Sequence, residues 1–228
     1  MGDTITIFYC IIVIPLLFSV LIVGKRSRKY IIYLIIGFTC CLIASVVNSF
    51  IRQIYNGSYL ELTTTCTPIV EEILKALPVF YYGMIFSDDK DTLVGIGFAT
   101  GVGFAILENG ISLLLNGESV SIMWALLRGF STSLMHAMTT ALMGLGLSFI
   151  KKRKKMALMA IFSFLTLAIV YHATFNELVQ SEILWIAIIF PFITFVCLLF
   201  LNTGEMAKKY FEKLREKNEE NRQKAARY

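Results

Sequence analysis

Seven long apolar stretches dominate the 228-residue chain and leave it little choice of fold. A helix needs about 20 predominantly apolar residues to cross a bilayer, and each stretch reaches about that length. The stretches are residues 4–23, 30–50, 67–86, 92–116, 121–150, 156–178 and 182–203. Only 16% of the residues are charged, whereas soluble domains have about a quarter. The sequence therefore predicts an all-α, polytopic membrane bundle of about seven transmembrane helices and excludes a soluble fold.

The sequence predicts one transmembrane bundle over residues 1–203 and a cytoplasmic tail of mixed basic and acidic residues over 204–228. The first apolar stretch has no basic residue before it and a basic run after it, which is typical of an anchor rather than a cleaved signal peptide. Four of the five cysteines lie inside apolar stretches, so they do not indicate a disulfide or zinc framework.

The basic residues predict the orientation of the bundle. If the N-terminus is outside, the cytoplasmic segments are 24–29, 87–91, 151–155 and 204–228. They hold four, one, five and eight lysines or arginines, which is 18 of the 21 in the chain. This asymmetry follows the positive-inside rule. We therefore expect the N-terminus outside and the C-terminus in the cytoplasm. The net charge of +5 then reflects orientation in a lipid bilayer and not binding to nucleic acid.

Ionisable side chains inside the predicted spans are the most informative residues for function. Each costs at least about 2.5 kcal/mol at the centre of a membrane helix, so each needs a partner or a role. In the third span, Glu71 and Glu72 stand four and three residues before Lys75, which places all three on one helical face. The other polar groups are Glu108 and Asn109 in the fourth span, Arg128 and His136 in the fifth, and His172 and Asn176 in the sixth.

The depths of these groups predict that they meet. At about 1.5 Å per residue, Glu71 lies about 6 Å below the outer end of its span, Glu108 and Arg128 about 10 Å, and His172 about 9 Å. His136 fits less well, at about 20 Å, although a tilted fifth helix would raise it. The sequence thus predicts a polar site in the outer leaflet.

Small residues predict where helices pack closely. Gly97 and Gly101 form a small-xxx-small pattern in the fourth span, and Gly144 and Gly146 lie in the fifth. Glycines at such spacing let two membrane helices approach each other, although glycine is also simply common in membrane helices. We expect these positions to let helix backbones pack closely around the polar site.

The combination of carboxylates, imidazoles and a carboxamide can activate water and stabilise an oxyanion. A carboxylate removed from bulk water binds a proton more strongly than an exposed one, which suits a general base, while imidazole and carboxamide N–H groups can stabilise an oxyanion. No serine or cysteine lies at a telling spacing from a histidine, so a covalent nucleophile is not indicated. No H-E-x-x-H zinc motif is present in the sequence either.

Four short motifs on four successive spans resemble those of a known family. They are Glu71-Glu72-Ile-Leu-Lys75, Gly103-Phe-Ala-Ile-Leu-Glu108-Asn109, His136 followed by Gly144, and His172-Ala-Thr-Phe-Asn176. Together they resemble the PrsW family of intramembrane proteases, within the CAAX-protease and bacteriocin-processing superfamily. The resemblance covers residues 67–178, the expected catalytic core. It implies a glutamate-dependent peptidase in a prokaryotic cell membrane that cuts a single-span anti-sigma factor on its extracytoplasmic side.

The resemblance also implies roles for individual residues. Either Glu71 or Glu72 would be the general base, and relatives that process prenylated proteins favour the first. Glu108 stands where those relatives have a histidine, so its role stays open. Asn176 matches those relatives and favours an oxyanion donor. The resulting prediction names as catalytic Glu71, Glu72, Glu108, His136, His172 and Asn176, with Lys75, Asn109 and Arg128 supporting them.

Three alternatives accompany this prediction. We expect no cofactor, but in a metal-dependent variant of the same protease, zinc would take nitrogen and oxygen ligands from Glu72, Glu108, His136 and His172. A proton- or ion-coupled transporter also uses intramembrane Glu and His residues, yet the spans below His136 are nearly bare of charge. A non-catalytic scaffold would leave the clustered polar groups unexplained. Arg128 is best interpreted as an ion-pair partner of Glu108 or Glu118.

Overall fold

A computed structural model of the chain describes residues 27–116, 120–149, 154–183, 185–197, 199–200 and 215. Within these ranges every regular element is a helix and there is no strand. The chain divides into two compact units, Met1–Pro191 and Phe192–Tyr228. All the residues discussed below as a site belong to the first unit.

The helices follow the predicted stretches closely. They are α2 (Ser27–Ile54), α3 (Tyr59–Thr64), α4 (Cys66–Ile85), α5 (Lys90–Asn116), α6 (Ile122–Leu127), the π-helical turn η2 (Arg128–Thr132), α7 (Ser133–Leu147) and α8 (Lys154–Val179), followed by a shorter apolar helix at Trp185–Cys197. The second to sixth predicted stretches are thus helical, which confirms the all-α prediction. The first stretch and the boundary predicted at residue 203 lie outside the described residues.

Three of the described helices are long and apolar enough to cross a membrane: Lys29–Ile54, Lys90–Leu115 and Leu158–Val179. Helix α4 is not among these three, and its charged side chains Glu71, Glu72 and Lys75 lie close together within its 20 residues. The count of seven spans and the orientation of the termini stay predictions.

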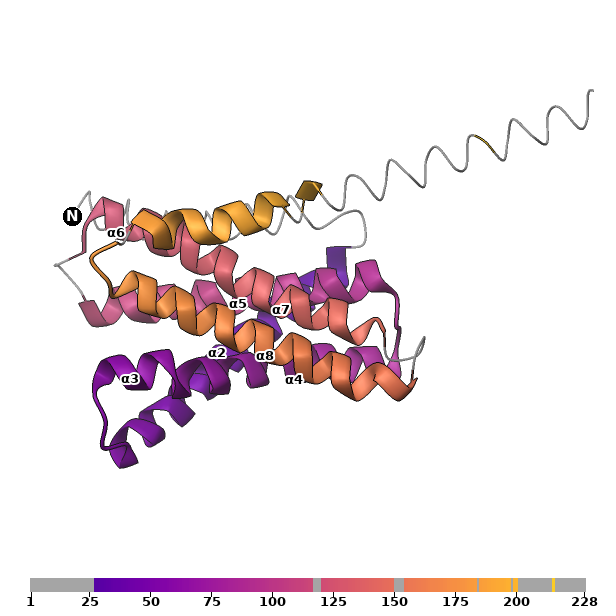
Figure 1. Cartoon of the computed structure of the whole chain (residues 1–228), viewed down its shortest axis with the longest axis horizontal. Coiled ribbons are helices and arrows are strands. Elements are labelled where there is room, and N and C mark those ends of the chain that lie inside the picture. The colour runs from indigo at the N-terminus through magenta and orange to yellow at the C-terminus, as the bar shows by residue number, and fades with distance from the viewer. Residues whose placement is uncertain are drawn as a thin grey trace, which may run out of the picture. The chain divides into compact units, whose positions relative to one another are not determined.

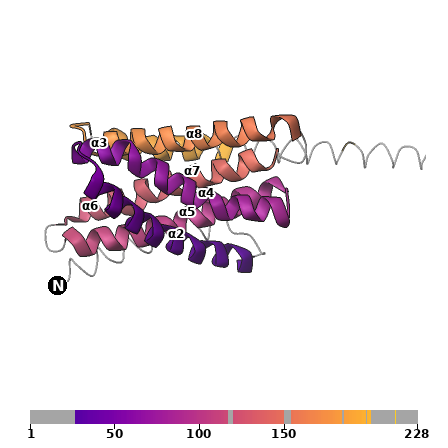
Figure 2. The ribbon, with the colours of Figure 1, turned by 90° about the horizontal axis from the view of Figure 1, so that it is seen from below.

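Helix α5 lies at the centre of the first unit. It packs against α2 on one side and against α7 on the other, and α4 contacts α2, α5, α7 and α8. In Figure 1 and Figure 2, α4, α5, α7 and α8 lie alongside one another, while α2 crosses them obliquely. This arrangement brings the inner faces of four helices to one place.

Two features depart from seven uniform helices joined by plain loops. The fifth predicted span is interrupted by the π-helical turn η2, between α6 and α7. The loop before α4 contains the short helix α3, which begins with a capping box: Ser58 Oγ accepts from the Glu61 amide at 3.2 Å, and Glu61 Oε2 accepts from the Ser58 amide at 2.8 Å. Both features contribute contacts to the candidate site.

The predicted glycine contacts are confirmed between α5 and α7. A Cβ at Gly97 would collide with the Thr140 carbonyl, and a Cβ at Gly101 with the His136 carbonyl. Only the absence of a side chain lets the two backbones lie this close. Gly101 therefore fixes the height and distance at which α7 presents His136 to α5.

We expect Gly101→Val to destabilise the protein, because the added atoms must push α7 away from α5. Overpacking of this kind costs about 1–3 kcal/mol or more, and thermal unfolding in detergent measures it. Gly110→Ala is the matched control on the same helix, since a Cβ there meets nothing within 4 Å. Equal melting temperatures for the two variants would contradict the packing described here.

Candidate active site

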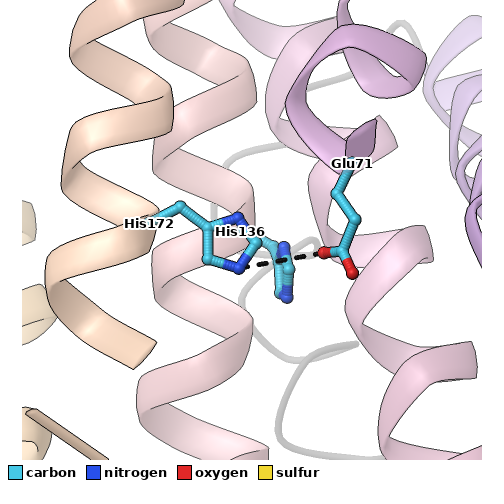
Figure 3. A group of neighbouring side chains, drawn as sticks. All are labelled: Glu71, His136 and His172. Atoms are coloured by element: carbon cyan, nitrogen blue, oxygen red, sulfur yellow. Dashed lines mark ion pairs between the residues drawn. The ribbon is translucent and has the colours of Figure 1, made fainter. Parts of the chain in front are cut away.

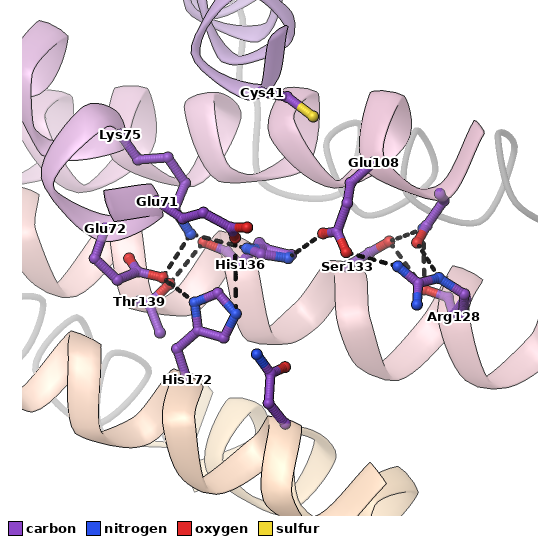
Figure 4. A network of polar contacts seen from close by, with 12 residues as sticks. Cys41, Glu71, Glu72, Lys75, Glu108, Arg128, Ser133, His136, Thr139 and His172 are labelled. Carbon is purple, nitrogen blue, oxygen red and sulfur yellow. Dashed lines mark hydrogen bonds and ion pairs between the residues drawn. The ribbon is translucent and has the colours of Figure 1, made fainter. Parts of the chain in front are cut away.

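The polar face of α4 is fully enclosed by the bundle. Glu72 and Lys75 are both 0% exposed, and Glu71 is 7% exposed. Lys75 Nζ lies 2.6 Å from Glu72 Oε1, which makes a buried ion pair. The sequence predicts this pair from the three-residue spacing. In the structure the pair is the start of a larger network (Figure 4).

Lys75 also determines the tautomer of His136. Its ammonium Nζ lies 2.8 Å from His136 Nδ1 and 4.9 Å from the centre of the Phe104 ring. An ammonium group has only donors, so Nδ1 must accept and the ring proton of neutral His136 resides on Nε2. That Nε2–H then donates to Glu108 Oε2 at 2.6 Å.

Glu108 is held from both sides by helix α7 and the turn before it. Its Oε2 faces His136, and its Oε1 accepts from Arg128 Nη2 at 2.6 Å. The predicted pairing of Arg128 with Glu108 is thus confirmed. Asn109 completes the brace, because its Oδ1 accepts from Arg128 Nε at 3.1 Å and its Nδ2 donates to the Arg128 carbonyl at 3.0 Å. The π-helical turn is therefore fixed by two adjacent side chains of α5.

His172 links α8 to both carboxylates of α4. Its Nδ1 lies 2.8 Å from Glu72 Oε1, and its Nε2 lies 3.8 Å from Glu71 Oε2. Glu72 is paired with Lys75 and is therefore an acceptor, so Nδ1–H donates to it and the Nε2 lone pair is directed toward Glu71. Glu72 Oε1 accepts a third hydrogen bond from Thr139 at 3.2 Å, while its buried Oε2 has no protein partner.

Glu71 has a different environment. Its Oε1 accepts from Asn48 Nδ2 of α2 at 3.3 Å, and its Oε2 faces His172. Asn48 is a site residue that the sequence prediction missed. The signal was present, since Asn48 is a carboxamide inside the apolar stretch 30–50, but that stretch contains no Asp, Glu, His, Lys or Arg that would draw attention to it.

Eight of the nine predicted residues lie in this one network. The ninth, Asn176, lies on α8, the helix that also carries His172. Asn176 Nδ2 donates to the carbonyl of Thr63 in α3 at 2.9 Å, and Gln180 Nε2 donates to Thr63 Oγ1 at 3.0 Å. The predicted convergence of distant polar groups is confirmed. His136 is included despite its expected depth, because it contacts Glu108 directly.

Three buried side chains of this network could hold a metal ion. Ligand atoms of Glu71, His136 and His172 all lie within 4.8 Å of one another (Figure 3). Two imidazoles and one carboxylate are a zinc donor set found in peptidases. The Glu72 carboxylate behind His172 is the kind of support that metal-bound histidines have. By donor type and proximity the residues fit a metal, although His136 would have to release Lys75 or Glu108. This group shares both histidines with the predicted zinc set and has Glu71 in place of Glu72 and Glu108.

The described residues form a helical membrane fold with a buried cluster of carboxylates and imidazoles, an arrangement that suits an intramembrane hydrolase. Comparison with models of protein families matches residues 25–202 to the PrsW family of intramembrane metalloproteases. The match covers most of the chain, so the protein belongs to the PrsW family and is a membrane protease. No curated protein and no solved structure matches the chain. The resemblance stated from the four motifs is confirmed, and the protease prediction prevails over the transporter and scaffold alternatives.

We expect Lys75→Met to lower the free energy of unfolding by about 3–5 kcal/mol, because it leaves the buried Glu72 carboxylate without its cation. Unfolding in mixed micelles measures the loss. The double variant Lys75→Met, Glu72→Leu removes both charges and should recover much of the stability. If the double variant is no more stable than Lys75→Met, the loss of stability does not come from the unpaired Glu72 carboxylate.

Proposed function

We propose that this protease hydrolyses a peptide bond of a single-span membrane protein, with Glu71 as the general base. One observation carries the assignment. Of the three carboxylates in the network, Glu72 is bonded to Lys75 and Glu108 to Arg128, whereas Glu71 contacts the neutral amide of Asn48 and the His172 ring. A carboxylate bound to a cation is a weak base, so Glu71 is the best placed to accept a proton.

The hydrolysis follows from the groups around Glu71. A water within reach of Glu71 Oε2 and His172 Nε2 gives its proton to Glu71 as its oxygen attacks the peptide carbonyl carbon. The carbonyl oxygen becomes an oxyanion. Asn176 has a second amide N–H besides the one given to Thr63, and we assign this N–H as the oxyanion donor. The proton then passes to the leaving nitrogen, the C–N bond breaks, and a carboxylic acid and an amine are released.

The proposed substrate is a single-span anti-sigma factor cut near the extracytoplasmic surface of a prokaryotic cell membrane. The family resemblance supports the substrate class, and the basic segment 151–155 supports the side. By the positive-inside rule this segment is cytoplasmic, and helix α8 starts beside it at Lys154. His172 lies near the other end of α8, which ends at Val179. These positions support our proposal that the site lies toward the outer surface.

Glu71→Gln should lower the rate of cleavage by about 10²–10⁴-fold, because an amide cannot accept the water proton. The assay is cleavage of candidate single-span proteins by the purified enzyme in liposomes, chosen by comparing such proteins in cells with and without the enzyme. Glu182→Gln, an exposed carboxylate beyond α8, is the matched control and should cut normally. Cleavage at the wild-type rate by Glu71→Gln would refute the role of Glu71.

A metal-dependent form of the same reaction is a second candidate, favoured by the Glu71, His136 and His172 group and by the family description. In that form these three side chains would bind the ion, and Glu72 would orient His172 through Nδ1. A bound zinc ion would supply a water that is nucleophilic at neutral pH.

Exhaustive chelation separates the two forms. If the enzyme is metal-dependent, elemental analysis should find about one zinc per chain before treatment, the melting temperature should fall on removal, and His172→Ala should reduce the metal content. If no metal is found and cleavage survives chelation, the metal-free form stands. The metal content and the melting temperature are independent of the cleavage rate of the loaded enzyme.

A further inference from the structure

Helix α2 lies outside the four sequence motifs, yet it reaches the candidate active site through one side chain. Asn48 Nδ2 donates to Glu71 Oε1 at 3.3 Å. The Oδ1 atom of the same amide is buried and has no protein partner. Buried polar atoms in folded proteins nearly always have a hydrogen-bond partner, so a buried acceptor beside the proposed base indicates that something else donates to it.

The position of Asn48 is fixed by the packing of α2. Its neighbours on the inner face, Cys41 and Ala44, are each 1% exposed and pack in one cluster with Phe104 of α5. Cys40 Sγ lies 3.4 Å from the carbonyl of Leu74, which ties α2 to α4 one turn after Glu71. Asn48 is therefore held rigidly opposite Glu71.

The chemical type of Asn48 is as important as its position. A lysine or arginine at this place would pair with Glu71 and weaken it as a base, as the cations do at Glu72 and Glu108. A carboxamide donates a hydrogen bond without neutralising the carboxylate. With Oε1 held by Asn48, Oε2 faces His172, which is the oxygen that our mechanism uses.

We propose that Asn48 is a positioning residue for the protease. Its Nδ2–H orients the Glu71 carboxylate so that Oε2 faces His172 and the reacting water, and its buried Oδ1 accepts a backbone N–H of the bound substrate. This assignment rests on the proposed role of Glu71. It adds α2 to the catalytic core that the motifs define.

Two variants test the proposal with the single-span substrate found in the cell comparison above. Asn48→Leu replaces the amide by an apolar side chain of similar size, and Asn48→Ser, a residue that α2 already carries at 45 and 49, has a side chain too short to reach Glu71. Both should lower kcat by about 10–100-fold, because a misaligned base loses about this much. Both should also raise KM, because the peptide loses its acceptor.

The control is Ser45→Ala, one turn away on the same helix, whose hydroxyl donates to the Cys41 carbonyl of its own helix at 2.9 Å. It should leave kcat and KM unchanged. If the folded Leu and Ser variants keep the wild-type kcat and lose only melting temperature, Asn48 is structural and the positioning role is overturned. An unchanged KM would overturn the substrate contact.

Glu71→Gln measured in parallel separates the two proposals. If Glu71→Gln is inactive while both Asn48 variants turn over normally, only the role of Asn48 fails. If Glu71→Gln is fully active, the proposed base is wrong, and any loss in the Asn48 variants has a different origin.

Discussion

The site depends on one buried cation. Lys75 has no exposed surface, and its ammonium joins Glu72 of its own helix to His136 of α7. An uncompensated charge in such a place costs several kcal/mol, so the pair is stable only while α4 and α7 are packed together. The same ammonium leaves His136 with its proton on Nε2, directed at Glu108. Thus one ion pair sets both the helix packing and the direction of the hydrogen bonds.

From Lys75 outward, the network divides three carboxylates into two kinds. Glu72 and Glu108 each contact a cation and an imidazole, and these contacts orient His172 and His136 respectively. Glu71 is hydrogen-bonded to the Asn48 amide and is not bonded to a lysine or arginine among the described residues, so it keeps its basicity. Residues of the same type thus acquire different properties because their contacts differ. In this way a pair of adjacent glutamates can supply one structural and one reactive group.

The sequence was sufficient for the parts of this site that follow from helical geometry. Spacing along α4 places Glu72 and Lys75 together, and counting residues from the ends of the spans predicts that the polar groups converge. It was insufficient where contacts depend on how helices cross. The depth counted for His136 is too great only if every helix is upright and starts at the same level. Asn176 contacts Thr63 only because α3 folds back beside α8. Asn48 stands in an apolar stretch without Asp, Glu, His, Lys or Arg, so the sequence does not mark it as a site residue.

Exposure along the network indicates how a membrane protease obtains water. The Glu72 and Lys75 side chains are 0% exposed, whereas those of Glu108 and Arg128 are 30% and 18% exposed. Ionised groups that are partly exposed hold water in a membrane protein, because hydrocarbon beside them would be far more costly. The hydrogen bonds from Arg128 through Glu108 to His136 therefore lead from the partly exposed end of the network to the fully buried ion pair of Glu72 and Lys75. Glu71 and His172 lie beside the inner end of this path, so the proposed reaction would take place where water can arrive but bulk solvent does not weaken the polar contacts.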